Sequence, residues 1–303
     1  MSPRVTVAHP RVLILSAALA TLLAAPLPAL AHGLAGNRFF PATIATDDPA
    51  VADELSLPTV SSQDGEAEFA GEWSKRFTPT FGLSIESAWT RDSSGAPTQT
   101  GFQNIGTTLK WQFLTDAPSE TILSAGLSAE WGGTGSRRVG AEDTTVVTPT
   151  FYFGKGFGGA AQDWVKPFAV TGLIGYAMPT SGRDKAGGLN PSSITGGLAF
   201  EYSLPYLNAH VRDHGWPGWV NQLTPLVEVA FERPVHNAGG EGLTGSVNPG
   251  VLWTGRRVQL GGEAIVPMNG DSGRGVGWAV QAHFFLDDIF PKSLGKPLFG
   301  AGQ

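Results

Sequence analysis

Ten polar side chains in this chain have the types and the spacing that could do chemistry. They fall at alternate positions of segments that are otherwise largely apolar, so each segment carries them on one face. The ten are Glu68, Glu72, Glu86, Lys110, Glu130, Glu201, Glu228, Glu263, Gln281 and His283. Seven carboxylates on one side would create a negative potential that favours cations or excludes anions. The alternative is that these acids pair with Arg or Lys from loops and neighbouring strands, or simply lie in water.

His283 is the member of this set that suits acid–base catalysis. It alternates with Gln281 and Phe285, so it shares their face of the strand. A hydrolase or acyltransferase site also needs a positioned serine and an orienting acid. Many serines alternate onto the same faces, but no Gly-x-Ser-x-Gly motif is present. We therefore expect His283 to be a plain polar side chain, and we expect no enzyme activity and no cofactor.

A metal could bind at the amino terminus of the mature chain. His32 would present an α-amine and an imidazole together, a pair that chelates copper when another histidine joins it. His210 and His214 are four residues apart and could supply that ligand from a helix. An ordinary polar terminus and a solvated loop explain the same residues, and there is no Cys for a thiolate site. No metal site is predicted.

The elements that carry the ten side chains are β-strands, since apolar and polar residues alternate with a period of two. Each strand is near ten residues long, a length that spans a bilayer as a tilted strand. The eleven segments are 66–75, 81–89, 105–113, 123–131, 147–157, 168–178, 194–204, 223–231, 246–253, 258–266 and 276–286. The connections between them alternate between short and long, as in outer-membrane barrels with short periplasmic turns.

This alternation of connections predicts one more strand. The segment after Glu66 must run toward the periplasm, so an outward strand has to precede it if the chain begins on the periplasmic side. The only sequence available is about Glu54–Ser61, where Leu55, Leu57 and Thr59 alternate weakly and Pro58 weakens the signal. We therefore predict an all-β fold, an antiparallel transmembrane β-barrel of about twelve strands.

Aromatic residues on the apolar faces indicate lipid as their neighbour. They cluster near both ends of the strands, while Leu, Ile, Val, Ala, Thr and Gly fill the middles. The predicted interface aromatics are Trp73, Phe81, Trp89, Trp111, Trp131, Tyr176, Tyr202, Trp253, Trp278 and Phe284. Two aromatic girdles around an aliphatic band are typical of a bilayer-spanning barrel. The ten polar side chains then face the lumen. A soluble β-sandwich or closed barrel is the alternative.

The two ends of the chain lie outside the predicted barrel at 54–287. Residues 1–31 have a positive start, the apolar run Val12–Leu23 and a small-x-small site at Ala29–Ala31, as in a cleaved secretory signal peptide. Residues 32–53 form a periplasmic or plug segment, and residues 288–303 a short periplasmic tail. Loss of Arg4 and Arg11 leaves 18 basic against 26 acidic groups, a balance of −8. This charge excludes nucleic acid as a partner.

Several strands turn or begin at a proline, and this pattern carries a resemblance to a known family. Examples are Val147-Thr148-Pro149-Thr150-Phe151, Leu223–Val227 and Val247–Val251, with Glu263–Pro267 at a strand end. The chain resembles the outer-membrane family named MetA-pathway of phenol degradation, also described as transporter-like. The resemblance implies a barrel channel of poorly known substrate. Unlike common outer-membrane proteins, this chain continues past Phe284–Leu286.

The function predicted from the sequence is a passive channel or transporter in the outer membrane of a Gram-negative bacterium. Its solutes are unidentified small molecules, with apolar or aromatic ones considered, and residues 32–58 partly occupy the lumen as a plug. A structural or binding barrel with a closed lumen is the alternative, followed by a barrel enzyme. Expected partners are outer-membrane lipid, lipopolysaccharide near Gly135–Arg138, and the barrel assembly machinery reading Phe284–Leu286.

Overall fold

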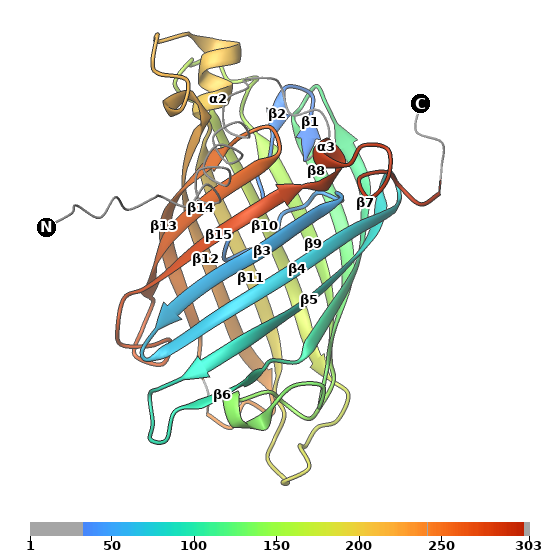
Figure 1. The fold of residues 1–303 in the computed structure, drawn as a ribbon, viewed down its shortest axis with the longest axis vertical. Coiled ribbons are helices and arrows are strands. Elements are labelled where there is room, and N and C mark those ends of the chain that lie inside the picture. Colours follow the sequence, from blue (N-terminus) through green and yellow to red (C-terminus); the bar gives the residue numbers. More distant parts are fainter. Residues whose placement is uncertain (1–32, 241, 300–303) are drawn as a thin grey trace, which may run out of the picture.

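Twelve antiparallel strands close into a barrel in the computed structural model, which describes residues 33–240 and 242–299 (Figure 1). The barrel strands are β3 (Glu54–Gln63), β4 (Glu66–Thr78), β5 (Phe81–Asp92), β7 (Ile105–Asp116), β8 (Thr121–Trp131), β9 (Val146–Gly156), β10 (Phe168–Pro179), β11 (Ser192–Tyr202), β12 (Leu223–His236), β13 (Thr244–Thr254), β14 (Val258–Pro267) and β15 (Gly277–Phe285). The predicted fold class and strand number are confirmed. The expected signal peptide and His32 lie outside the described residues.

The additional strand predicted from the alternation of short and long connections is β3, and it closes the barrel. It pairs with β15 on one side, with Val60 opposite Val280, and with β4 on the other. Both pairings shift register beside Ser56, next to Pro58. Proline cannot donate a backbone hydrogen bond, so a bulge is the expected response in a strand paired on both sides. This irregularity explains why the alternation in β3 is weak.

The two ends of the barrel differ. One end, which we call the termini end, carries the turns at 79–80, 117–120 and 255–257 and the connections 157–167 and 203–222 (Figure 1). The N-terminal ribbon of β1 (Leu34–Ala35) and β2 (Arg38–Phe39) and the helix α3 (Leu286–Ile289) lie there too. The connection 203–222 contains only short helical turns, α2 (Leu204–Tyr206), η2 (Leu207–Val211) and η3 (Val220–Gln222).

The other end, which we call the loop end, holds mostly longer connections. It includes the strand β6 (Gln99–Phe102), paired with the end of β5, and the turn η1 (Arg137–Val139). The exception is the hairpin between β3 and β4, which turns at residues 64–65. Asp64 and Gly65 both have positive φ there, which is the conformation that a two-residue hairpin with a type I′ turn requires.

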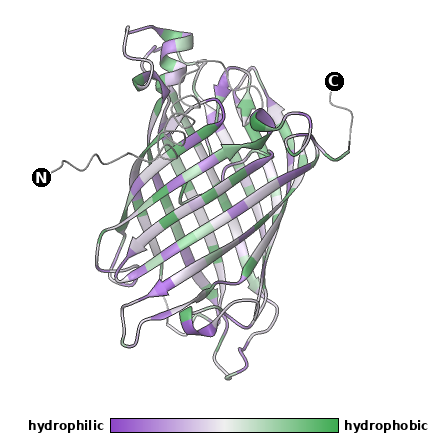
Figure 2. Ribbon diagram, viewed as in Figure 1, coloured by the Kyte–Doolittle hydropathy of each residue, from purple (hydrophilic) through white to green (hydrophobic). Residues whose placement is uncertain are grey.

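The outer wall of the barrel is apolar. Large side chains in mid-strand are about half exposed on it, including Leu127, Ile174 and Val251, and Figure 2 shows such residues recurring along the strands. A contiguous exposed apolar surface on this scale suits lipid rather than water. Of the predicted interface aromatics, Trp73, Trp111, Trp131, Tyr176 and Trp278 are more than a third exposed. The other five are partly covered: Phe81, Trp89, Tyr202, Trp253 and Phe284.

The apolar core inside the barrel is small. Ala35, Phe40, Ile122 and Ala169 are almost fully buried together where the chain enters the termini end. Further apolar side chains such as Leu226, Leu252 and Phe285 are buried outside this cluster, together with many polar side chains, and a cavity fills the remaining space. Within the described ranges, no helix is long and apolar enough to cross a membrane.

Candidate functional site

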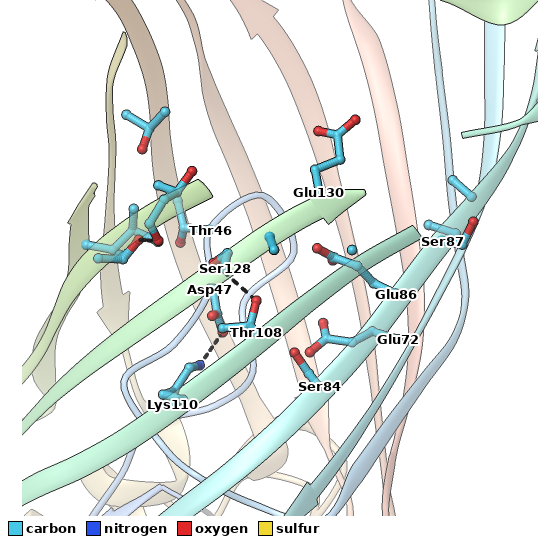
Figure 3. A pocket seen from close by; sticks show the side chains of 18 of the residues that line it. Thr46, Asp47, Glu72, Ser84, Glu86, Ser87, Thr108, Lys110, Ser128 and Glu130 are labelled. Carbon is cyan, nitrogen blue, oxygen red and sulfur yellow. Dashed lines mark hydrogen bonds and ion pairs between the residues drawn. The ribbon is translucent and has the colours of Figure 1, made fainter. Parts of the chain in front are cut away.

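A cavity of about 1160 Å³ lies inside the barrel (Figure 3). Inward side chains of the strands form its wall. Residues 42–52 of the N-terminal segment, which we define as residues 33–53, line it from within the lumen. Residues from three connections at the loop end, among them Asn104, Glu142 and Asn190, also line it. The cavity therefore runs from the loop end down to the N-terminal segment.

The lining of this cavity is acidic. Ten carboxylates line it, against two ammonium groups, Lys75 and Lys110. The carboxylates are those of Asp47, Asp48, Glu54, Glu68, Glu72, Glu86, Glu130, Glu142, Asp184 and Glu232. Because low-dielectric walls surround this space, the charges act over its whole width and attract cations.

Seven of the ten polar side chains singled out in the sequence line the cavity: Glu68, Glu72, Glu86, Lys110, Glu130, Gln281 and His283. The other three, Glu201, Glu228 and Glu263, are buried in the barrel interior. Glu263 accepts a hydrogen bond from Asn248, and Glu201 lies 3.4 Å from the Thr171 hydroxyl. Within the described part of the chain, no salt bridge to Lys or Arg is found for the seven acids, so the pairing considered as an alternative from the sequence does not apply to them.

Three glutamates come together on the wall formed by β4, β5, β7 and β8. Glu72 and Glu86 are direct cross-strand partners, and Glu130 points into the same space (Figure 3). Gly106 lies between them, opposite both Glu86 and Glu130. A Cβ at Gly106 would lie 2.6 Å from Glu86 Oε1, so the glycine leaves room for the carboxylate. Among the described residues no cluster of three or more ligating side chains could hold a metal ion.

The N-terminal segment is held in the lumen by Glu228 of β12. Its carboxylate accepts hydrogen bonds from the backbone N–H groups of Ile44, Ala45 and Thr46, at 2.8, 3.1 and 2.8 Å. The Thr46 hydroxyl donates a fourth, at 2.9 Å. Consecutive backbone N–H groups that converge in this way form an anion-binding nest. The hydrogen bonds from the nest replace the hydration that the Glu228 carboxylate has lost, since this side chain is fully buried.

Lys110 of β7 holds the same segment from the opposite side. Its ammonium donates to Asp47 Oδ1 at 2.8 Å and to the Asp48 carbonyl at 2.9 Å. It also lies 4.6 Å from the centre of the Tyr152 ring, within cation–π range. The lysine among the ten polar side chains is thus bound to the N-terminal segment.

β7 makes a second contact with the segment, and two further strands, β8 and β14, contact it as well. Gln112 accepts a hydrogen bond from the Val51 backbone, and Gln259 donates to the Ala42 carbonyl. Ser124 donates to the carbonyl of Pro49. The segment thus bonds to side chains of β7, β8, β12 and β14, and it crosses the lumen rather than lying along one wall.

Arg38 anchors the segment where it enters the barrel. The side chain is fully buried; it pairs with Glu120 at 3.2 Å, donates to the carbonyls of Lys166 and Pro167, and lies over the Tyr206 ring at 3.8 Å. Tyr206 donates its hydroxyl to Glu120 at 2.8 Å. Burial raises the pKa of Tyr206 to about 12, and the bond to Glu120 adds to the shift. The phenol therefore remains a donor at neutral pH.

A second buried cluster joins both ends of the barrel chain. Asp53 accepts from Lys75 at 2.7 Å and from Arg76 at 2.8 Å, at the start of β3. Lys75 also donates to the carbonyls of Leu294 and Lys296. The residues after β15 are thereby packed against the end of β4.

The remaining sequence candidates lie apart from the cavity. His210 and His214 make ring contacts with Tyr206 and Trp216 respectively. Arg137 is exposed at the loop end and pairs with Asp143. His283, by contrast, lines the cavity and contacts Ser56, whose hydroxyl is 2.8 Å from its Nδ1.

Sequence reasoning missed Arg38, Asp53, Ser56 and the backbone nest at 44–46. Only Asp53 has a local signal, a charge directly before a strand. The others acquire their roles through partners more than 80 residues away, which no periodicity reports.

Comparisons with known proteins support the fold. No family model and no curated protein matches the sequence, so the family resemblance inferred from proline-containing strands stays a prediction. Among solved structures, the COG4313 outer membrane channel from Pseudomonas putida F1 is similar with a TM-score of 0.51 and 10% identity, over 82% of this chain and 99% of that one. The NanC porin, at 9% identity, covers 77% of this chain and 98% of its own with a TM-score of 0.49. The KdgM porin, at 13% identity, covers 76% and 98% with a TM-score of 0.46.

Proposed function

We propose that this protein is a bacterial outer-membrane channel for small cationic or polar solutes, narrowed by its own N-terminal segment. The observation that carries the proposal is the acidic cavity inside a barrel whose outer wall is apolar. The termini end would face the periplasm, as in barrels with short periplasmic turns. The fold is shared with a protein described as an outer membrane channel.

The chemistry of the lining decides which solutes we propose. Ten carboxylates, many serines and threonines and few large apolar side chains line the cavity. Such a wall lowers the free energy of cations and raises that of anions. Apolar or aromatic solutes, considered from the sequence, would gain little from it. We therefore favour cations and cationic polar molecules.

Reconstitution into planar lipid bilayers tests this function. With a KCl gradient across the membrane, the reversal potential reports the preference for K⁺ over Cl⁻. We expect a cation preference in the wild type and a weaker one in the double variant E72Q/E86Q, which removes two facing charges from the cavity. The matched control is E66Q/D92N, which neutralises another facing pair on the same two strands, outside the cavity lining.

Three outcomes would contradict the proposal. The first is an anion preference, and the second is a cation preference equally weakened by both double variants. The third is a folded barrel without conductance, both in the wild type and in E228Q, where the nest of the N-terminal segment has lost its carboxylate. That third outcome would favour a barrel with a closed lumen.

A further inference from the structure

Ser56, His283 and Glu54 lie together at the termini end of the cavity and all three line it. Ser56 of β3 and His283 of β15 are direct partners across the strand pair that closes the barrel. Ser56 Oγ is 2.8 Å from His283 Nδ1, and Glu54 Oε2 is 3.4 Å from His283 Nε2. A hydroxyl, an imidazole and a carboxylate are thus arranged in series.

We propose that these three residues form a hydrolytic site for small carboxylic esters that enter the cavity. Ser56 is the nucleophile, His283 the general base and Glu54 the positioning residue. This role is independent of conduction, and it departs from the sequence-based expectation that the protein has no enzyme activity. The arrangement follows the logic of a serine, a base within hydrogen-bond reach and an acid that orients the base.

The surroundings of His283 hold its ring in place. The side chain is 4% exposed, and its ring packs against Phe285 with centroids 5.2 Å apart. The carboxylate of Glu54 favours the tautomer with the proton on Nε2, which leaves Nδ1 free to accept from Ser56. Nε2 makes no hydrogen bond of regular geometry within the described part of the chain. Catalytic hydrogen bonds are often long without substrate and shorten when it binds.

The reaction conserves atoms and charge in two steps. Ser56 Oγ bonds to the ester carbonyl carbon while its proton passes to His283 Nδ1; the bond to the leaving alkoxy group then breaks, and that oxygen takes the proton. The acylated serine is next attacked by water, which gives a proton to Nδ1. The bond to Ser56 Oγ breaks, the serine takes back the proton, and a carboxylic acid is released.

Two features of the cavity suit this chemistry. Gln281 lies two residues from His283 on the same face and donates one amide hydrogen to Thr59; we assign its other hydrogen to the oxyanion that develops on the carbonyl. The ten carboxylates of the lining disfavour anionic esters and repel the carboxylate product. The substrates should therefore be neutral or cationic esters of small size.

A serine-reactive probe tests the assignment directly. The full barrel, purified in detergent and checked for folding by heat-modifiable gel mobility, is treated with a small fluorophosphonate, and the modified residue is located by mass spectrometry. We expect an adduct on Ser56 and hydrolysis of p-nitrophenyl acetate. Both should be lost in S56A and slowed about 100-fold or more in H283Q, in line with the loss of a general base. The control S84A removes another serine of the cavity wall and should leave both unchanged.

The role of Glu54 is tested by the pH dependence of hydrolysis, which a residue with only a structural role would not change. E54Q should lower the hydrolysis rate and shift the pH dependence of the rate, while heat-modifiable mobility stays as in the wild type. A folded wild-type barrel without an adduct on Ser56 would refute the site, as would equal labelling in H283Q. Because labelling in detergent does not require conductance, these outcomes are separate from the test of the channel.

Discussion

The buried charges of Glu228 and Arg38 are stabilised by contacts between the N-terminal segment and the rest of the chain. An ionised carboxylate or guanidinium away from water costs several kcal/mol unless hydrogen bonds replace its hydration. Glu228 obtains four such bonds and Arg38 obtains an acid, two carbonyls and an aromatic face. Each charge thus depends on a partner distant in sequence, and removing one partner should be costly.

Replacing Arg38 by methionine should destabilise the barrel strongly. Methionine keeps part of the apolar stem of the side chain but removes the guanidinium, which leaves the buried carboxylate of Glu120 without its ion-pair partner. We expect the free energy of unfolding in lipid vesicles, measured by urea titration, to fall by roughly 3–5 kcal/mol. The control D163N removes the exposed Asp163 side chain from its ion pair with Lys166 and should cost less than about 1 kcal/mol. Equal losses in the two variants would show that Arg38 is not an anchor.

Neutralising Glu228 should release the N-terminal segment. In E228Q one carboxylate oxygen becomes an amide N–H₂ that faces backbone donors, so charge-assisted bonds worth about 1.5–3 kcal/mol each are lost. Because the chain has no cysteine, A42C provides a single thiol on the segment, at a buried position. We expect maleimide labelling of A42C to be about tenfold faster or more with E228Q, in line with 1.4 kcal/mol per factor of ten.

The control for this experiment is A42C with E232Q. Glu232 lies on the same strand and lines the cavity, and no hydrogen bond to the N-terminal segment is found for it within the described residues. Its labelling rate should equal that of A42C alone. Labelling that is equally slow in both double variants would mean that the nest does not hold the segment.

Among the structural elements, the sequence predicts the strands in which apolar and polar residues alternate, and it predicts little of the others. Eleven strands are evident because a lipid-facing apolar residue recurs at every second position. The strand β3 could be predicted only from the alternation of short and long connections, because Pro58 interrupts its pattern of alternating residues. The sequence predicts that residues 32–58 partly occupy the lumen, but the path of residues 40–53 there could not be predicted, since the segment has no period and its bonds reach strands far along the chain. For the same reason the sequence could not bring Ser56 to His283: their pairing depends on the register in which β3 meets β15.

A charge on the outer wall of β13 tests which face meets lipid. Val251 is 42% exposed on that wall and is the eighth of the eleven residues of the strand. V251R should lower the free energy of unfolding in lipid by roughly 2–4 kcal/mol if the residue lies near the midplane, and slow assembly as followed by heat-modifiable mobility. The control E86R places arginine on the cavity wall, in contact with water and acids, and should cost much less. A V251R barrel as stable as the wild type would mean that the outer face is not in lipid.

At the scale of the whole molecule, closure ties together the two ends of the barrel sequence. The first barrel strand, β3, pairs with the last, β15, and the N-terminal segment and the C-terminal residues meet at Asp53, Lys75 and Arg76. Closure leaves no unpaired strand edge in the bilayer, where unsatisfied backbone groups are costly. The same closure creates the cavity, so conduction, the bound segment and the Ser56–His283 contact all depend on it.

A cross-link between β3 and β15 tests closure directly. Val60 and Val280 are direct cross-strand partners on the outer wall, and opposite positions of an antiparallel pair lie within reach of a disulfide. In a chain without cysteine of its own, V60C/V280C should form an intramolecular disulfide on mild oxidation and migrate faster than its reduced form on denaturing gels. V60C/V251C, which pairs β3 with the non-adjacent β13, should not. A folded V60C/V280C barrel without the cross-link would contradict closure through β3, because the two thiols would then be far apart, and the strand at Glu54–Gln63 would have to be assigned outside the barrel.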